Sequence, residues 1–442
     1  MNVANPSPDR LASLAALGPE PVTFPERHGI QPTSTLYGGA HRFRVGSLVK
    51  LGNAVLTAVD SYLSNDNEFA ACFGMPSVAS VSSLRERVRA SLERTPIEDV
   101  RIDFEDGYGP RTDEDEDAHA ELAGEAIAEK RVELWPARIG IRVRAFEAAT
   151  AKRSLRTLAI VVDTMVARGW RPSRDPFRVT LPKVTQLQEL AMAARALERL
   201  ETDHDLPARS FVLEAMVETP DALLDREGRV PIALWASVSR GRLAAMHFGA
   251  FDYTASLGVP ARSQSLDHPS CLYVRSVIGL AAARSDLEVS DGPFLEIPIG
   301  PHRDAALGSA EDRENREVVH RAFRHHAERV RRQLAEGYPQ GWDIHPAQIV
   351  SRRAAVLTSY VEGRDNVLRR LDTFFGTKAQ ATRTGNTFDD AASARALLAE
   401  VRRGIRLGFD DANLVAAFLG LAPEDLLHAP LLELPGKRRL AP

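Results

Sequence analysis

The segments FRVTLPKV at residues 177–184 and SFVLEAMVETP at residues 210–220 are short runs rich in apolar and β-branched residues. Such runs are typical of buried strands. Between them, apolar residues recur at the spacing of one helix face: Leu187, Leu190, Ala191, Ala194 and Leu197. A strand, a helix and a second strand in this order predict a βαβ unit with parallel strands.

The same alternation continues in both directions from this unit. Six further strand candidates are TLYGG at 35–39, VRIDFED at 100–106, IGIRVRAF at 139–146, LAAMHFGAFD at 243–252, LEVSDGPF at 287–294 and GWDIHPAQI at 341–349. We expect one helix after each strand. Eight such units over roughly 320 residues predict an α/β fold of the closed (β/α)8 TIM barrel type, with an open doubly wound sheet as the alternative.

The two ends of the chain differ from this alternation. Residues 1–34 contain six prolines, among them Pro6, Pro8, Pro21 and Pro25, and few apolar anchors, which predicts an N-terminal arm before a barrel at 35–360. Residues 361–442 are expected to form a C-terminal helical extension that contains two amphipathic stretches, AASARALLAEVRRGIRLGF and DDANLVAAFLGL. Their apolar faces need a partner. We expect either a lid on the mouth of an adjacent protomer or, about equally, an extra helical pair against the side of the barrel.

Composition excludes several classes of protein. Apolar residues make up 44% of the 442 residues and charged residues 26%, as in ordinary globular proteins. Lys and Arg number 56 against 60 Asp and Glu, so the net charge of −4 indicates neither a nucleic-acid nor a membrane-surface partner. Cys72 and Cys271 are the only cysteines, and no apolar run approaches the ~18 residues of a membrane span. We therefore expect a soluble, cytoplasmic protein.

Common catalytic and nucleotide motifs are missing. GYGPRT at 107–112 begins like a dinucleotide-binding loop but has Thr112 where the third glycine should stand. The sequence contains no Walker A motif, HExxH, CxxC or GxSxG. The chemistry must therefore be sought at the carboxyl ends of the strands, where TIM barrels carry their active sites.

Nearly every predicted strand ends in a charged residue. The candidates are Glu105, Asp106, Arg142, Arg144, Lys183, Glu218, Asp252, Asp291, Asp343 and His345. Each of them alone is as readily explained as a solvated or structural residue. Together, carboxylates crowded at one mouth repel each other, so such a site usually holds a cation, and hard oxygen ligands favour Mg²⁺ over zinc.

Specific roles follow for some of these residues. Glu218 and Asp252, on adjacent strands, are the expected Mg²⁺ ligands. Arg142 offers a planar fork for a substrate carboxylate or an enolate oxygen, and Gly249 leaves space for the substrate beside Asp252. His345 is equally a candidate for proton transfer and for a structural histidine bonded to the backbone.

The series DFEDGYG, IRVR, LPKV, VETP, FGAFDYTASLG, SDGPF and DIHPAQI, in this order, resembles the superfamily of the citrate lyase β-subunit and malyl-CoA lyase, also called the HpcH/HpaI aldolase family. The resemblance covers roughly residues 98–352, and its most specific parts are IHPAQ and the paired Glu105 and Asp106. It implies a TIM barrel that binds Mg²⁺ and makes or breaks a carbon-carbon bond beside a carboxylate or acyl group. It also implies a homo-oligomer, a trimer or hexamer.

By this resemblance, Glu218 and Asp252 are the metal ligands and Arg142 is the substrate arginine. Glu105 and Asp106 are then the pair that orients metal-bound water and the arginine. The chain departs from the family pattern at Arg144, where relatives have asparagine. A second cation at the mouth, together with Lys183, predicts a more acidic substrate and places the chain in a divergent branch, so coenzyme A dependence does not follow.

We therefore expect a Mg²⁺-dependent carbon-carbon lyase or aldolase that acts on a 2-oxo acid, a hydroxy acid or an acyl-CoA through an enolate. A carboxylate of the tail, such as Asp389 or Asp390, could reach the site of a neighbouring subunit. One alternative is a metal-independent aldolase with Lys183 as Schiff-base nucleophile. The other is a barrel without catalysis that serves as a binding protein.

Overall fold

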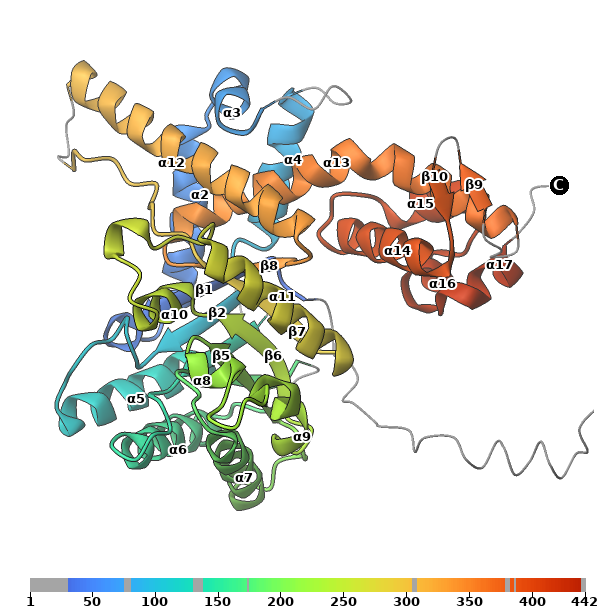
Figure 1. Ribbon diagram of the computed structural model, residues 1–442. Coiled ribbons are helices and arrows are strands. Elements are labelled where there is room, and N and C mark those ends of the chain that lie inside the picture. Colours follow the sequence, from blue (N-terminus) through green and yellow to red (C-terminus); the bar gives the residue numbers. More distant parts are fainter. Residues whose placement is uncertain are drawn as a thin grey trace, which may run out of the picture.

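The computed structural model describes residues 31–74, 81–129, 138–172, 175–303, 308–377, 382–384 and 387–438. Within them, eight parallel strands close into a barrel in chain order, β8 pairing with β1 (Figure 1). The strands are β1 (Ser34–Gly39), β2 (Asp99–Asp103), β3 (Arg138–Arg142), β4 (Phe177–Leu181), β5 (Phe211–Val217), β6 (Leu243–Phe248), β7 (Glu288–Pro293) and β8 (Gln340–Asp343). Each of the eight strand candidates overlaps one of them, and the TIM barrel prediction is confirmed.

The expectation of one helix after each strand is wrong at three connections. β1 is followed by η1 (Ala40–Arg42), α2 (Ser47–Tyr62), α3 (Asp66–Phe73) and α4 (Val81–Arg94). β5 is followed by α8 (Pro220–Leu223), η2 (Pro231–Leu234) and α9 (Trp235–Val238), and β6 by α10 (Ala250–Ser256), η3 (Ala261–Ser263) and α11 (Pro269–Arg284). The other strands lead into α5 (Asp113–Ala128), α6 (Ala151–Ala167), α7 (Leu187–Asp203), α12 (Ser309–Ala335) and α13 (Pro346–Gly376).

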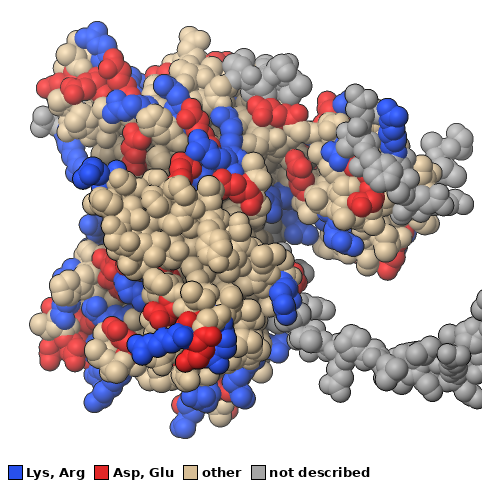
Figure 2. Space-filling model, in the orientation of Figure 1, with Lys and Arg blue, Asp and Glu red and all other residues tan. Residues whose placement is uncertain are grey.

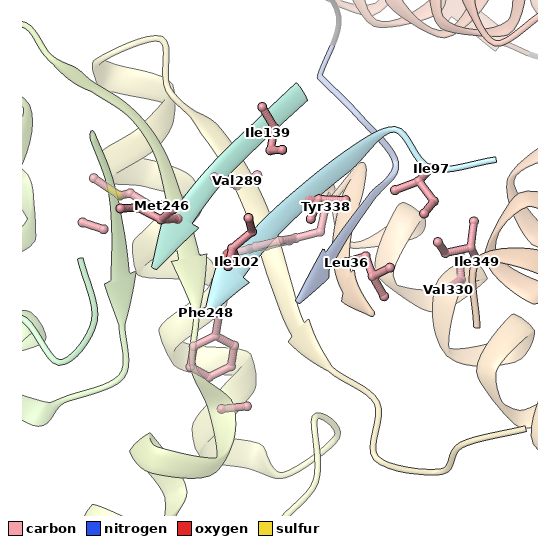
Figure 3. Packing of buried hydrophobic residues seen from close by; sticks show 14 of the residues in the cluster. Leu36, Ile97, Ile102, Ile139, Met246, Phe248, Val289, Val330, Tyr338 and Ile349 are labelled. Atoms are coloured by element: carbon pink, nitrogen blue, oxygen red, sulfur yellow. The ribbon is translucent and has the colours of Figure 1, made fainter. Parts of the chain in front are cut away.

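The apolar core lies between the barrel wall and the surrounding helices. Leu36 of β1 and Ile97, which precedes β2, pack toward Val330 of α12 and Ile349 of α13 (Figure 3). All four side chains are buried. Because successive strand residues point to opposite faces, this outward apolar packing leaves the alternate residues of each strand facing the inside of the barrel.

The inside of the barrel is charged. Arg101 of β2 donates to Glu214 of β5 from Nη2 at 2.6 Å and from Nε at 2.8 Å. Arg178 Nη1 also lies 3.1 Å from Glu214, and Arg138 Nη1 lies 2.7 Å from Glu288. The Arg101–Glu214 and Arg138–Glu288 pairs connect strands that are not neighbours, so they cross the barrel interior, whereas Arg178 and Glu214 lie on the adjacent strands β4 and β5. Branched apolar residues usually fill this space, and here paired charges fill much of it.

The tail continues from the barrel without a break, because α13 runs through the expected boundary at residue 360. A second apolar core forms where the end of α13, with Leu371 and Phe374, packs against the last helices. These are α14 (Ala391–Arg406), α15 (Ala412–Leu419), α16 (Pro423–His428), η4 (Leu431–Glu433) and α17 (Leu434–Lys437). The expectation that strands stop after 360 is wrong, since β9 (Thr382–Thr384) and β10 (Thr387–Asp389) form an antiparallel pair.

The tail lies at the end of the barrel opposite the mouth of its own chain (Figure 1). A cavity between α14 and the barrel is lined by Leu287 and Pro339, which directly precede β7 and β8. The apolar faces of Leu398 and Val401 are buried in the tail's own core. The arm predicted at 1–34 falls largely on residues 1–30, outside the described residues, and a lid on a second protomer stays a prediction.

Among the helices in the described ranges, none combines the length and the apolar character that crossing a bilayer requires.

Candidate active site

Arg142, the last residue of β3, is buried at the carboxyl end of the barrel. Its guanidinium forms a fork on Asp103, from Nε to Oδ1 at 2.7 Å and from Nη2 to Oδ2 at 2.6 Å. The rings of Tyr37 and Trp342 flank it, with centroids 5.2 Å and 5.1 Å from Cζ. Nη1 lies 3.2 Å from Glu105 Oε2, so the donor left over by the fork points toward the acidic loop after β2.

Asp103 also organises that acidic loop. Its Oδ1 accepts the backbone N–H of Glu105 at 3.0 Å, and its Oδ2 accepts that of Gly107 at 2.8 Å. A Cβ on Gly107 would stand 2.6 Å from Asp103 Oδ2, so only glycine permits this approach. One buried carboxylate therefore fixes both Arg142 and the loop with Glu105 and Asp106.

Lys183 gathers three carboxylates above Arg142. Its Nζ contacts Glu105, lies 3.0 Å from Asp106 Oδ1 and lies 3.8 Å from Asp252 Oδ1. Lys183 follows β4 in a left-handed backbone conformation, with φ of 49°. Few residues other than glycine adopt this conformation, so it carries a cost in strain. The turn directs the backbone and the side chain of Lys183 to different partners.

Glu218, directly after β5, is the most buried carboxylate of this group. Its Oε1 accepts the backbone N–H of Lys183 at 2.6 Å. Burial, aided by the charge of Asp252, raises the pKa of Glu218 to about 8. A carboxyl in such a position favours either a proton or a cation.

Gly249 provides the space that Glu218 fills. A Cβ at residue 249 would come within 2.1 Å of Glu218 Oε2 and 2.4 Å of Glu218 Cβ. From the sequence, this space was predicted to hold substrate. In the structure, the side chain of Glu218 takes it up.

Gly249→Ala is expected to push Glu218 out of place and to lower the free energy of unfolding by about 1–3 kcal/mol, the usual cost of overpacking. Denaturant unfolding measures the loss. Gly279→Ala in α11 is the matched control, since no atom lies within 4 Å of a Cβ there. Equal stability of Gly249→Ala and the wild-type protein would contradict the predicted contact.

Three more carboxyl groups of the site have shifted pKa values, two of them raised and one lowered. Burial raises the pKa of Glu105 to about 6, and burial likewise raises the pKa of Asp252. Burial acts on Asp106 in the same sense, but its contacts with Glu105, Arg142 and Lys183 outweigh it and lower the pKa of Asp106. The site thus holds carboxyl groups of different acidity around one ammonium.

The structure directs some predicted site residues elsewhere. Arg144 Nε donates to Glu116 of α5 at 2.9 Å, away from Lys183 and its carboxylates. His345 caps α13, its Nδ1 accepting the N–H of Ala347 at 3.2 Å, as expected of a structural histidine. Burial lowers the pKa of His345.

Other acidic candidates are bound in structural pairs. Asp343 pairs with Arg352 at 2.8 Å, Asp291 pairs with Arg329 at 2.7 Å, and Asp389 pairs with Arg370 at 2.6 Å. Asp390 caps α14 through the N–H groups of Ala392 and Ser393. None of these pairs joins the mouth group formed by Glu105, Asp106, Arg142, Lys183, Glu218 and Asp252.

Asp103 is the residue of this site that sequence reasoning missed. It stands two positions before Glu105 in DFED, and its strand pairs with β3 so that Asp103 is opposite Arg142. The signal in the sequence was the alternation of Arg101 and Asp103 with apolar residues, which places both inside the barrel. Within the described residues, no three His, Cys, Asp or Glu side chains form a ready-made metal cluster.

A family model described as a domain of unknown function, DUF6986, matches residues 21–429 of the sequence. The chain belongs to this family. The comparison with curated proteins finds no match.

Solved structures with similar folds include a citrate lyase from Burkholderia xenovorans LB400. It is 20% identical, the alignment covers 87% of this chain and 94% of that one, and the TM-score is 0.54. CitE from Mycobacterium tuberculosis in complex with magnesium, acetoacetate and coenzyme A is 19% identical over 84% and 97% of the two chains, with a TM-score of 0.46. The magnesium and glyoxylate complex of Haloferax volcanii malate synthase is 15% identical over 90% and 98%, with a TM-score of 0.46. The resemblance drawn from the motifs is thereby confirmed at the level of the fold.

Proposed function

We propose that this DUF6986 protein is a carbon-carbon lyase or aldolase that acts on a small carboxylate or acyl substrate through an enolate. The observation that carries the proposal is the meeting of Arg142, Lys183 and four carboxylates at the carboxyl end of the barrel, where such folds carry their active sites. The citrate lyase with a similar fold adds support for a reaction of this class.

The donor set at the mouth fits a divalent cation. Glu105, Asp106 and Asp252 already surround one positive charge, the ammonium of Lys183. Burial and the charge of Asp252 raise the pKa of Glu218, so a cation beside this carboxyl would stabilise its charged form. Glu218 and Asp252 would hold Mg²⁺, and when bound the ion would supply a Lewis acid that polarises a keto or thioester oxygen.

Arg142 would stabilise the negative charge that develops on the substrate. Its fork is taken by Asp103, so Nη1 is the donor directed to the mouth. The rings of Tyr37 and Trp342 lie together on one side of the guanidinium and exclude water there, and a charge held in such surroundings acts strongly on a nearby oxyanion. No movement of Arg142 is needed during the reaction, because Asp103 holds it in place.

The surroundings of Lys183 argue against the Schiff-base alternative. Burial tends to lower its pKa, but the carboxylates of Glu105, Asp106 and Asp252 outweigh burial and raise the pKa of the ammonium. A Schiff-base nucleophile needs a neutral amine, which is reached by lowering the pKa. Lys183 therefore serves better as a fixed positive charge that binds or screens carboxylates.

Two measurements on the purified protein test the proposed function. With a panel of 2-oxo acids, hydroxy acids and acyl-CoA thioesters, we expect turnover that EDTA removes and Mg²⁺ restores. Borohydride added with substrate should trap no adduct on Lys183. Turnover that survives EDTA with a trapped adduct would contradict the metal mechanism, and binding of substrates without any turnover would favour a binding protein.

Arg142→Lys is expected to lower the rate by about 10²-fold or more, because an ammonium cannot hold the fork on Asp103 and still reach the substrate oxygen. Steady-state kinetics with the substrate identified above measures the loss. Calorimetric titration with Mg²⁺ is the control and should give the wild-type affinity. Near-normal kinetics of this variant would mean that Arg142 is purely structural.

A further inference from the structure

A basic cavity of about 620 Å³ lies along α14, in the tail. Its lining contains four arginines of one helix, Arg395, Arg402, Arg403 and Arg406. An apolar wall of Leu398, Pro430, Leu431 and Leu432 completes it. Basic side chains are visible in the cleft between the barrel and the C-terminal helices (Figure 2).

Three of the four arginines, Arg395, Arg402 and Arg406, have no carboxylate partner within the described residues, whereas the charge of Arg403 acts on the nearby Glu400. Its described lining contains no Asp or Glu. Arg402 donates from Nε to the carbonyl of Leu426 at 2.7 Å and from Nη2 to that of Ala429 at 2.5 Å, and both acceptors are neutral. In the part of the chain that the structure describes, no carboxylate pairs with Arg395 or Arg406. Burial, with repulsion from Arg406, lowers the pKa of Arg402, and burial lowers that of Arg406.

The spacing of the arginines defines the shape of a suitable ligand. Arg395, Arg402 and Arg406 are separated by seven and four residues, so they form one stripe along the helix. At 1.5 Å per residue, the stripe is about 16 Å long. One phosphate group can contact only part of it, whereas an elongated ligand with several negative charges can contact all three guanidinium groups.

We propose that this cavity binds a nucleoside polyphosphate. Its phosphates would lie along Arg395, Arg402 and Arg406, since guanidinium groups match phosphate oxygens in pairs. Its nucleoside would pack against Leu432, the exposed apolar residue of the lining. The volume is within the usual range of small-molecule sites, about 300–1,000 Å³.

The position of the cavity separates such a ligand from the mouth of the barrel. A neighbouring cavity shares Gln31, Ala399 and Arg403 with it and reaches Leu287 and Pro339 at the amino ends of β7 and β8. The mouth with Glu218 lies at the other end of the barrel. The proposal is therefore independent of the reaction proposed above.

Calorimetric titration of the full chain with ATP and with inorganic phosphate, both in EDTA, tests the site. We expect ATP to bind the wild-type protein at least ten times more tightly than phosphate. Arg395→Glu combined with Arg406→Glu should weaken ATP binding by about 100-fold or more, as charge-assisted hydrogen bonds are replaced by repulsion. Both side chains are exposed, so thermal unfolding without ATP should be unchanged.

Two further variants complete the test. Arg195→Glu is the matched control, because Arg195 is an exposed arginine on the distant helix α7, and it should bind ATP as the wild-type protein does. If the charge reversal impairs folding, Arg395→Gln with Arg406→Gln should weaken binding by about 10-fold. Wild-type affinity in the charge-altered variants, equal affinity for phosphate and ATP, or no binding of ATP at millimolar concentration would overturn the proposal.

Discussion

Glu218→Gln and Asp252→Asn are expected to abolish Mg²⁺ binding and to lower turnover by about 10³-fold or more, because a divalent cation contributes several kcal/mol of charge stabilisation in the transition state. Each change removes an oxygen ligand that would be negatively charged with the cation bound, and keeps the shape of the side chain. Calorimetric titration with Mg²⁺ gives the affinity, and kinetics with the substrate found in the panel gives the turnover.

The fold should survive both substitutions. Burial raises the pKa of Glu218 to about 8, so the carboxyl is largely protonated at pH 7 in these surroundings, and glutamine matches it in charge and shape. Asp252 is partly exposed. Glu198→Gln, at a partly exposed carboxylate on α7 outside the mouth, serves as control and should leave Mg²⁺ affinity unchanged. Unchanged Mg²⁺ affinity in both mouth variants would disprove the ligand assignment.

The strands of the barrel could be predicted because each is a short apolar run, and segments with the apolar spacing of a helix separate these runs from one another. The helices after β1, β5 and β6 could not, since several elements replace one periodic segment there. The sequence left His345 open between proton transfer and a structural role. Pro346 follows it at the first helical position, and a proline there is a signal that the preceding residue caps a helix. The structure adds the capping hydrogen bond, which depends on where α13 begins.

The sequence was enough to locate the residues of the candidate site at the ends of strands. It was not enough to predict the hydrogen bonds and ion pairs that join them. Lys183 was correctly located after β4. Its positive φ, which turns its N–H to Glu218, could not be predicted, because a lysine in the sequence does not indicate this conformation. The bond from Arg142 to Asp103 joins residues 39 positions apart, and only the register of β2 and β3 brings them opposite each other. Arg144 was expected at the mouth, but the helix that follows the acidic loop supplies Glu116 as its partner.

The fork of Arg142 on Asp103 leads to the second large expected effect. Asp103→Asn is expected to lower the free energy of unfolding by about 3–5 kcal/mol, because removal of one partner leaves a buried charge uncompensated. An asparagine amide also turns one N–H donor group toward the guanidinium, where an acceptor is needed. The loop with Glu105 and Gly107 should loosen as well, since both N–H groups rely on this carboxylate.

A double-mutant cycle with Arg142→Met separates this pair from general damage to the barrel. The variant with both changes carries no uncompensated charge at this position, so it should be less destabilised than the sum of the two single variants. Denaturant unfolding of the four proteins gives the coupling energy, which we expect to exceed about 1 kcal/mol for residues in direct contact. Simple additivity of the two changes would show that Asp103 acts on the loop alone and that Arg142 is held by its other neighbours.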